Sequence, residues 1–187
     1  RRLGTQDVAF GIVTSGRGVD FPGVERVAGP CYQFTPVRVR FESHWTGADL
    51  MHHVQQQTAE SGAHDFLGYE EIAALCADWR ATDGHVQLFD SVVHHQDWDD
   101  FDTMPFGQGT CRVEIVNPHG DAPYPVKVVS FVRQSKLQLG IVGDEGDATI
   151  VRQLLGRLVE TAQELAEGAG AELSSLLNRT GSWSERV

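Results

Sequence analysis

The chain has 187 residues, of which 41% are hydrophobic, and a formal net charge of −11 at pH 7. That length and apolar content suit one soluble globular domain or one large lobe of a bigger domain. The acidic balance, without a basic stripe, excludes nucleic acid as an expected partner. No long apolar run and no signal-like N-terminus occur, so we expect neither a membrane span nor secretion.

The cysteines point to the cellular compartment. Cys31, Cys76 and Cys111 are odd in number, widely spaced and set in apolar sequence. A disulfide framework or a zinc site would need closer spacing. We therefore predict reduced, buried thiols in a cytoplasmic protein.

The first third of the chain predicts two strands around a loop. Residues Asp7–Ser15 are nearly continuously apolar, as in a buried strand. Glycines and a proline between residues 16 and 23 break that strand and mark a loop. Polar and apolar residues alternate again at Arg38–Phe41, as at the end of a half-exposed strand.

Two helices are predicted next. Thr46 is followed three residues later by Asp49, the pattern of a capping box. The helix that it opens continues to Ser61 and Gly62, where the apolar pattern stops. A shorter helix with an apolar stripe is expected at about Tyr69–Trp79.

The middle of the chain predicts further strands. Val86–His95 and Arg112–Val116 have strand composition, and the acidic, aromatic segment Trp98–Gly109 between them is expected to be an irregular loop. Pro125–Val132 and Leu137–Val142 should pair as a hairpin across a short turn.

The last element is a long helix. Asp147 is a suitable N-cap, and apolar residues recur at helical spacing over Ile150–Leu165, which we expect to be core. Gly168 should loosen or end the helix, and Ala171–Asn178 has the pattern of another turn or two of helix. The order of elements predicts an α/β fold of the α+β sandwich type, a mixed sheet with helices packed on it.

Several short motifs, in this order, resemble the condensation domains of nonribosomal peptide synthetases. The strand that begins Gly-Pro-Cys resembles the fungal members in particular. The motifs are Ser15-Gly16-Arg17, the loop Phe21-Pro22-Gly23-Val24-Glu25, the strand from Gly29-Pro30-Cys31, the helix Trp45-Thr46 to His53-Val54-Gln55, the run His64 to Tyr69, the strand Phe89 to Val93, and His95-Gln96.

The resemblance implies a chloramphenicol-acetyltransferase-like lobe, one of two that form a condensation domain. Residues 1–168 would be its C-terminal lobe and residues 169–187 a C-terminal helix or linker. The family's catalytic His-His-x-x-x-Asp-Gly would lie in an N-terminal lobe that this chain lacks. Amide bonds would form on peptidyl thioesters. The 4'-phosphopantetheine arm of a peptidyl carrier domain would deliver them, and the chain itself would bind no cofactor.

The resemblance also implies site residues, which would line a substrate tunnel or floor loop: Ser15, Gly16, Arg17, Gln33, Phe34 and Arg38. No catalytic residue is expected in this chain. Plainer alternatives stay open for these residues. Ser15 could be only a turn residue, Arg17 could pair with a carboxylate to fix the loop, and Arg38 could cover apolar surface with its stem.

Gln33 and Phe34 depart from the Asn and Thr of the family pattern. A larger amide and a phenyl ring would reshape a tunnel that they line. A specialised member, such as a terminal cyclising domain of a fungal synthetase, would show this change. Drift at structural positions would also produce it.

A segment from His94 to Asp100 nearly repeats the catalytic signature, with Asp in place of the final Gly. A histidine held by a carboxylate is a general base, so a single-lobe acyltransferase using His95 and Asp99 is one alternative. A strand end leading into an acidic surface loop is the plainer interpretation. A non-catalytic module that docks a carrier protein is a further alternative.

The histidines give no metal pattern. His52 and His53 are adjacent on the predicted helix, so they point about 100° apart and do not chelate together. His44, His64 and His119 lack Cys or carboxylate partners at ligand spacing, and no metal site is predicted.

Overall fold

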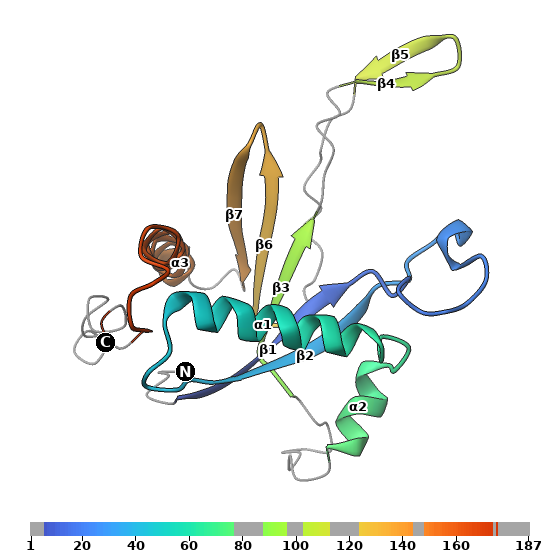
Figure 1. Ribbon diagram of the computed structural model, residues 1–187. Coiled ribbons are helices and arrows are strands. Elements are labelled where there is room, and N and C mark those ends of the chain that lie inside the picture. Colours follow the sequence, from blue (N-terminus) through green and yellow to red (C-terminus); the bar gives the residue numbers. More distant parts are fainter. Residues whose placement is uncertain are drawn as a thin grey trace.

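The computed structural model describes residues 6–76, 88–96, 103–112, 124–143, 148–173 and 175. Its main feature is a five-stranded mixed sheet in the order β2-β1-β3-β6-β7 (Figure 1). The strands are β1 (Asp7–Thr14), β2 (Gln33–Arg40), β3 (Ser91–Gln96), β6 (Val126–Arg133) and β7 (Lys136–Gly143). β1 and β3, and β3 and β6, run parallel, whereas the outer pairs are antiparallel. The predicted mixed sheet is confirmed.

Helices pack on this sheet, as the sequence predicted. They are α1 (Gly47–Gly62), α2 (Tyr69–Leu75) and α3 (Ala148–Glu167), with a 3-10 turn η1 (Val24–Arg26) in the loop after β1. The capping box at the start of α1 is confirmed, because Thr46 and Asp49 each accept a hydrogen bond from the other's main-chain N–H.

The start of α1 lies against the end of α3. A Cβ added to Gly47 would come 2.9 Å from Leu165 Cδ2 and 3.3 Å from the Ala169 carbonyl oxygen. Glycine leaves room for this close approach, and a larger residue would push the Leu165 side chain aside. An isolated antiparallel bridge between Thr46 and Glu172 continues the contact.

The edge strand β2 alternates buried and exposed residues. Thr35, Val37 and Val39 are buried, and Arg38 and Arg40 between and beyond them are exposed. Such alternation is what a strand with one covered face requires. It matches the polar and apolar pattern from which the strand was predicted.

The core beside the loop end of β1 is aromatic. Buried Ala73, Leu88, Phe89 and Val92 form a cluster against which Phe34 and other half-buried residues pack. The Phe89 ring lies so close to β1 that a Cβ on Gly11 would come 2.4 Å from it. Glycine at this position lets the ring pack directly on the strand.

The β6–β7 hairpin is confirmed with its turn at Gln134 and Ser135. Their φ angles are 51° and 59°. Two consecutive positive φ angles are the signature of the hairpin turn whose twist matches that of its strands. Glycine or asparagine is more common at such positions, so this turn carries some backbone strain.

The segment between β3 and β6 differs from the prediction. Within the expected irregular loop lies β4 (Thr103–Phe106), which pairs with β5 (Gly109–Arg112) across a turn at Gly107. This hairpin stands away from the main sheet (Figure 1). Its strands are short and almost wholly exposed, so they lack the apolar alternation from which a strand is recognised.

Other predicted boundaries shift. β3 begins at Ser91 rather than Val86, because residues 88–90 are not extended. α2 ends at Leu75. The predicted end at Trp79, the residues Val86, Trp98 and Asp147, and half of Ala171–Asn178 lie outside the described residues.

The apolar stripe of α3 is not the buried core that we expected. No residue described in α3 is fully buried, and Ile150 and Val159 expose 49% and 37% of their surface. The helix lies on the edge strand β7, where Val151 would come 3.1 Å from a Cβ on Gly143. An edge strand gives a helix less surface to cover than the middle of a sheet does.

The cysteines are free, as expected, but they are not buried. Cys31 and Cys111 are half-buried, and Cys76 is exposed. Cys76 caps the C-terminal end of α2 and Cys111 belongs to the β4–β5 hairpin, so both lie away from the core.

Candidate functional site

Most of the predicted site residues gather at one end of the β1–β2 pair. Ser15, Gly16 and Arg17 follow β1, and Gln33 and Phe34 open β2, where they pair with Thr14 and Val13. Arg38 does not join them. At roughly 3.3 Å per residue, it lies about 13 Å further along β2 than Phe34.

The residues Ser15–Arg17 form a tight turn. The Arg17 main-chain N–H donates to Ser15 Oγ at 3.2 Å. Gly16 has a φ of 62°, and a Cβ there would come 1.7 Å from the Cys31 carbonyl oxygen. Only glycine fits, because both the backbone conformation and the space exclude a side chain. The structure is consistent with the plainer expectation of Ser15 as a turn residue.

Arg17 closes the loop that follows the turn. Its Nη2 donates to the main-chain carbonyls of Val27 at 2.9 Å and Gly29 at 3.0 Å. Among the residues that the structure describes, its partners are these carbonyls and not the expected carboxylate, and through them Arg17 does fix the loop. Carbonyls left free by an irregular loop are strong acceptors, and a guanidinium can serve two of them at once.

Phe34 is part of a row of aromatic rings. It meets Tyr32 edge-on at a centroid distance of 5.7 Å and Tyr124 at 5.3 Å. Tyr124 continues the row to Phe89 at 5.2 Å, and Phe89 meets Tyr69 at 5.3 Å. The phenyl ring therefore has a packing role. Sequence reasoning missed Tyr124, because a contact across 90 positions has no local pattern.

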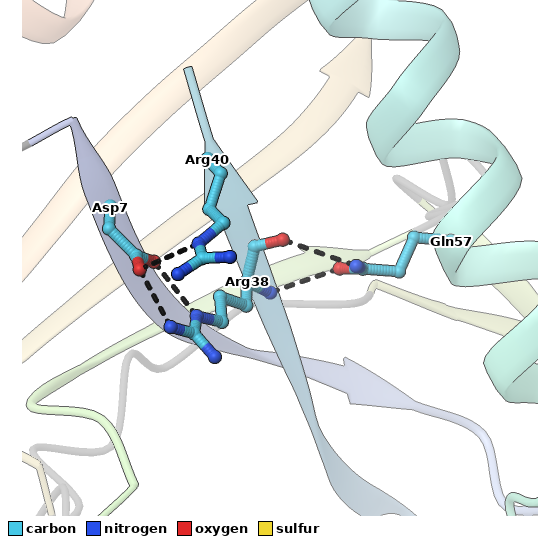
Figure 2. Close-up of polar contacts among 4 residues, drawn as sticks. All are labelled: Asp7, Arg38, Arg40 and Gln57. Carbon is cyan, nitrogen blue, oxygen red and sulfur yellow. Dashed lines mark hydrogen bonds and ion pairs between the residues drawn. The ribbon is translucent and has the colours of Figure 1, made fainter. Parts of the chain in front are cut away.

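Arg38 takes part in an ion cluster with Asp7 and Arg40. Figure 2 shows its guanidinium and that of Arg40 meeting the Asp7 carboxylate from the neighbouring strand. Arg38 Nε and Nη2 donate to the two carboxylate oxygens at 2.8 and 2.6 Å, and Arg40 Nε adds a contact at 3.1 Å. Hydrogen bonds from Arg38 first, and then from Arg40, lower the pKa of Asp7 to about 2.

Gln57 of α1 binds the main chain of the same strand residue. Its amide accepts from the Arg38 N–H at 3.0 Å and donates to the Arg38 carbonyl at 3.1 Å (Figure 2). The side chain thus imitates a neighbouring strand at the open edge of β2. Arg38 is held on both its side chain and its main chain.

A buried carboxylate lies beneath the turn and was not singled out from the sequence. Asp65, which is 7% exposed, accepts hydrogen bonds on Oδ1 from Thr14 at 2.6 Å and from Thr35 at 3.2 Å. The motif from His64 to Tyr69 marked this segment, but nothing in its spacing indicated a contact with β1. Asp65 joins the connection between α1 and α2 to both strands of the site.

One histidine of β3 has a partner on the neighbouring strand. His95 Nδ1 lies 2.9 Å from Ser130 Oγ on the neighbouring strand β6. Burial first, and then the charges of Lys127 and His95, lower the pKa of His94. Asp99 and Asp100 lie outside the described residues, so the predicted His–Asp contact remains a prediction.

No metal-binding cluster is found among the residues that the structure describes. The His53 ring meets Trp45 at a tilt of 45° with 4.8 Å between the ring centroids, which accounts for one of the helical histidines. In the same described ranges, none of the helices is long and apolar enough to cross a membrane.

Comparison with known proteins gives a consistent result. A family model described as "Condensation domain" matches residues 1–178. Nonribosomal peptide synthetase sidD of Aspergillus fumigatus is 58% identical over 166 residues, which are 89% of this chain and 8% of that protein. Nonribosomal peptide synthetase 6 of Cochliobolus miyabeanus is 36% identical over 171 residues, or 88% of this chain and 10% of that protein.

Solved structures share the fold. One described as "The crystal structure of CT" matches with a TM-score of 0.73 and 22% identity, over 91% of this chain and 39% of that one. A mutant starter condensation domain of the rhizomide synthetase RzmA, in complex with C8-CoA, matches with a TM-score of 0.69 and 18% identity, over 92% of this chain and 38% of that one. The expected chloramphenicol-acetyltransferase-like fold is confirmed. The chain spans about two fifths of these structures and a tenth or less of the two synthetases above.

Proposed function

Since the chain belongs to the condensation-domain family of fungal nonribosomal peptide synthetases, we propose that it is the C-terminal lobe of such a domain. In this proposal it helps to form amide bonds on thioesters held by a carrier domain. The observation that carries the proposal is the family match over residues 1–178, together with the 58% identity to a fungal synthetase. The lobe boundary at residue 168, and the place of the family's catalytic histidines in an N-terminal lobe outside residues 1–187, are part of the proposal.

The proposed reaction is the attack of an acceptor amine on the thioester. The amine nitrogen bonds to the carbonyl carbon, the carbon–sulfur bond breaks, and the thiol leaves on the carrier. The amine proton passes to a base, which we place in the N-terminal lobe. This chain contributes position and shape, the effects that turn two bound reactants into a productive pair.

We assign the cleft-facing role to the cluster at the loop end of the strands, namely Ser15, Gly16, Arg17, Gln33 and Phe34. The turn and the loop closed by Arg17 form a fixed surface, which is what a tunnel wall or floor requires. Arg38, predicted for the same site, lies further along β2 in the Asp7 cluster. We propose that it supports the strand pair from there.

The 4'-phosphopantetheine arm belongs to the carrier and is substrate for this lobe. Near the turn, Phe21 and Tyr32 expose 64% and 56% of their surface. Exposed rings fit the alkyl and amide groups of such an arm. Arg17 Nη2 is bound to carbonyls, so Arg17 shapes the loop and is not assigned to the phosphate.

A finer part of the proposal concerns product release. A cyclising domain would use an amine of the peptide itself as the acceptor, and the departure at Gln33 and Phe34 led to this idea. The packing of Phe34 between Tyr32 and Tyr124 supports the other explanation, drift at a structural position, at least as well. The mass of the product distinguishes cyclisation from release by hydrolysis, because a cyclic peptide is lighter than the hydrolysed peptide by one water.

The test is reconstitution of a domain with both lobes. It receives a peptidyl thioester on a carrier domain and an acceptor amine, and the product is identified by mass spectrometry. We expect an amide product that disappears when the histidines of the family signature in the N-terminal lobe are replaced. A carrier that binds tightly without any product would contradict the proposal and identify a docking module.

One specific observation supports a second candidate function, that of a single-lobe acyltransferase that uses His95 as its base. Ser130 holds the Nδ1 side of the His95 ring, and a base needs such an orienting contact. A single-lobe acyltransferase would lose its activity in this chain alone on the substitution His95→Ala. An unchanged rate would remove this candidate.

A further inference from the structure

Asp65 is a buried acidic side chain to which neither the resemblance nor the proposed function gives a role. It is 7% exposed, and its Oδ1 accepts from the hydroxyls of Thr14 at 2.6 Å and Thr35 at 3.2 Å. The two hydroxyls are themselves 3.4 Å apart. A carboxylate removed from water is unfavourable unless donors replace the lost hydration. Here two strands supply them.

The main chain around Asp65 is firmly held. Successive turns bind the amides of residues 63, 64 and 65 to the carbonyls of Glu60, Ser61 and Gly62 at 3.3, 2.9 and 3.3 Å. The Leu67 amide continues the series to the His64 carbonyl at 3.0 Å. The carboxylate therefore projects from a fixed segment.

The hydrogen-bond partners of Asp65, Thr14 and Thr35, lie next to the site residues. Thr14 is the last residue of β1 and directly precedes the turn Ser15–Arg17. Thr35 directly follows Phe34 on β2 and is itself 8% exposed. One buried oxygen thus links the two strand ends from which both site segments emerge. Arg17 fixes the far side of the same turn through the carbonyls at residues 27 and 29.

We propose that Asp65 is a positioning residue that sets the orientation of the Ser15–Arg17 turn through Thr14 and Thr35. The effect of Asp65 on amide formation rests on the proposed function. Its effect on the order of the turn does not depend on that function. Asp65 touches no reacting atom and acts by fixing the direction in which β1 enters the turn.

The test uses Thr14→Val, which removes one hydroxyl at nearly constant size, and Thr14→Ser, which keeps it. Asp49→Ala is the matched control, since it removes a cap at the opposite end of α1 and touches neither strand. All variants are made in the two-lobed domain. An Asp65→Asn variant removes the negative charge but keeps an acceptor oxygen for the Thr14 and Thr35 hydroxyls.

The first readout is cleavage by trypsin, followed by mass spectrometry. The Arg17–Gly18 bond can enter the protease only when Arg17 leaves its carbonyls, whereas Arg38 and Arg40 in β2 report unfolding of the sheet. We expect Thr14→Val to raise cleavage after Arg17 on the order of tenfold relative to cleavage in β2, as a local opening does. Thr14→Ser and Asp49→Ala should leave that ratio unchanged.

The second readout is the rate of amide formation. Thr14→Val should lower kcat by roughly tenfold to a hundredfold with little change in KM for the carrier thioester, because misplaced groups slow the reaction after binding. Thr14→Ser should restore the rate.

Two results would overturn the inference. One is an unchanged cleavage ratio in Thr14→Val, which would make Asp65 a general anchor of the fold. The other is an opened turn with a normal rate in a wild-type domain that does form amides. If the wild-type domain forms no amide while the cleavage ratio still rises, the proposed function fails and the ordering of the turn by Asp65 is supported.

Discussion

Replacing Phe34 by threonine decides between a ring that packs and a ring that only lines a tunnel. The substitution restores the residue type of the family pattern. It also removes a half-buried ring that meets Tyr32 and Tyr124 at 5.7 and 5.3 Å. If the ring is structural, its loss must appear as a lower free energy of unfolding in the absence of any substrate.

The expected loss is about 2.5–5.5 kcal/mol, from half the cost of a buried ring plus two ring pairs. Truncating a fully buried phenylalanine costs about 3–5 kcal/mol, and Phe34 is half-buried, so roughly half of that applies. Each edge-on ring pair adds about 0.5–1.5 kcal/mol beyond its buried area. Phe21→Thr is the matched control. Its ring is 64% exposed, and the change should stay within about 0.5 kcal/mol.

Urea unfolding, followed by tryptophan fluorescence, measures both variants. A double-mutant cycle of Phe34→Leu with Tyr124→Leu should show a coupling of about 0.5–1.5 kcal/mol between the rings. If Phe34→Thr unfolds at the same urea concentration as wild type, the ring does not stabilise the strand end. The packing explanation for the departure from the family pattern would then be refuted.

Other parts of the structure give further predictions. Gly16→Ala should cost at least about 1–3 kcal/mol because of its φ of 62°, and unchanged urea unfolding would show that the turn does not need this backbone conformation. Thr46→Ala should cost about 1 kcal/mol by removing the cap of α1, and Thr46→Ser should recover most of it; equal losses in thermal unfolding would contradict the capping contact. Asp7 has its pKa lowered to about 2, so its ion pairs with Arg38 and Arg40 stabilise the fold above pH about 4 and this contribution is lost as the pH falls toward 2. A carbon-detected NMR titration should show the pKa of Asp7 moving back toward 3.8 in Arg38→Gln, and an unmoved pKa would exclude Arg38 as the main cause.

The elements with local signals could be predicted from the sequence. β1 is a nearly continuous apolar run, and the start of α1 is fixed by Thr46 and Asp49 three positions apart. The β6–β7 hairpin was recognised from two apolar runs around a short polar turn. In each case the deciding residues are close neighbours in sequence, so spacing alone carries the information.

Contacts between distant residues could not be predicted in the same way. Asp65 meets Thr14 across 51 positions, and neither residue is unusual by itself. The partners of Arg17 are main-chain carbonyls, which leave no trace in the side-chain sequence. The β4–β5 strands bury no face and so show no alternation. The resemblance grouped Arg38 with the turn, whereas in the structure it is bound to Asp7 further along the strand.

The most direct test of the account is a single-turnover reaction with the N-terminal lobe, a carrier-bound peptidyl thioester and an acceptor amine, run with and without this chain. We predict an amide product, identified by its mass, only when both lobes are present. Equal product without this chain, or none with both lobes while the carrier still binds, would contradict a role for this lobe in amide formation.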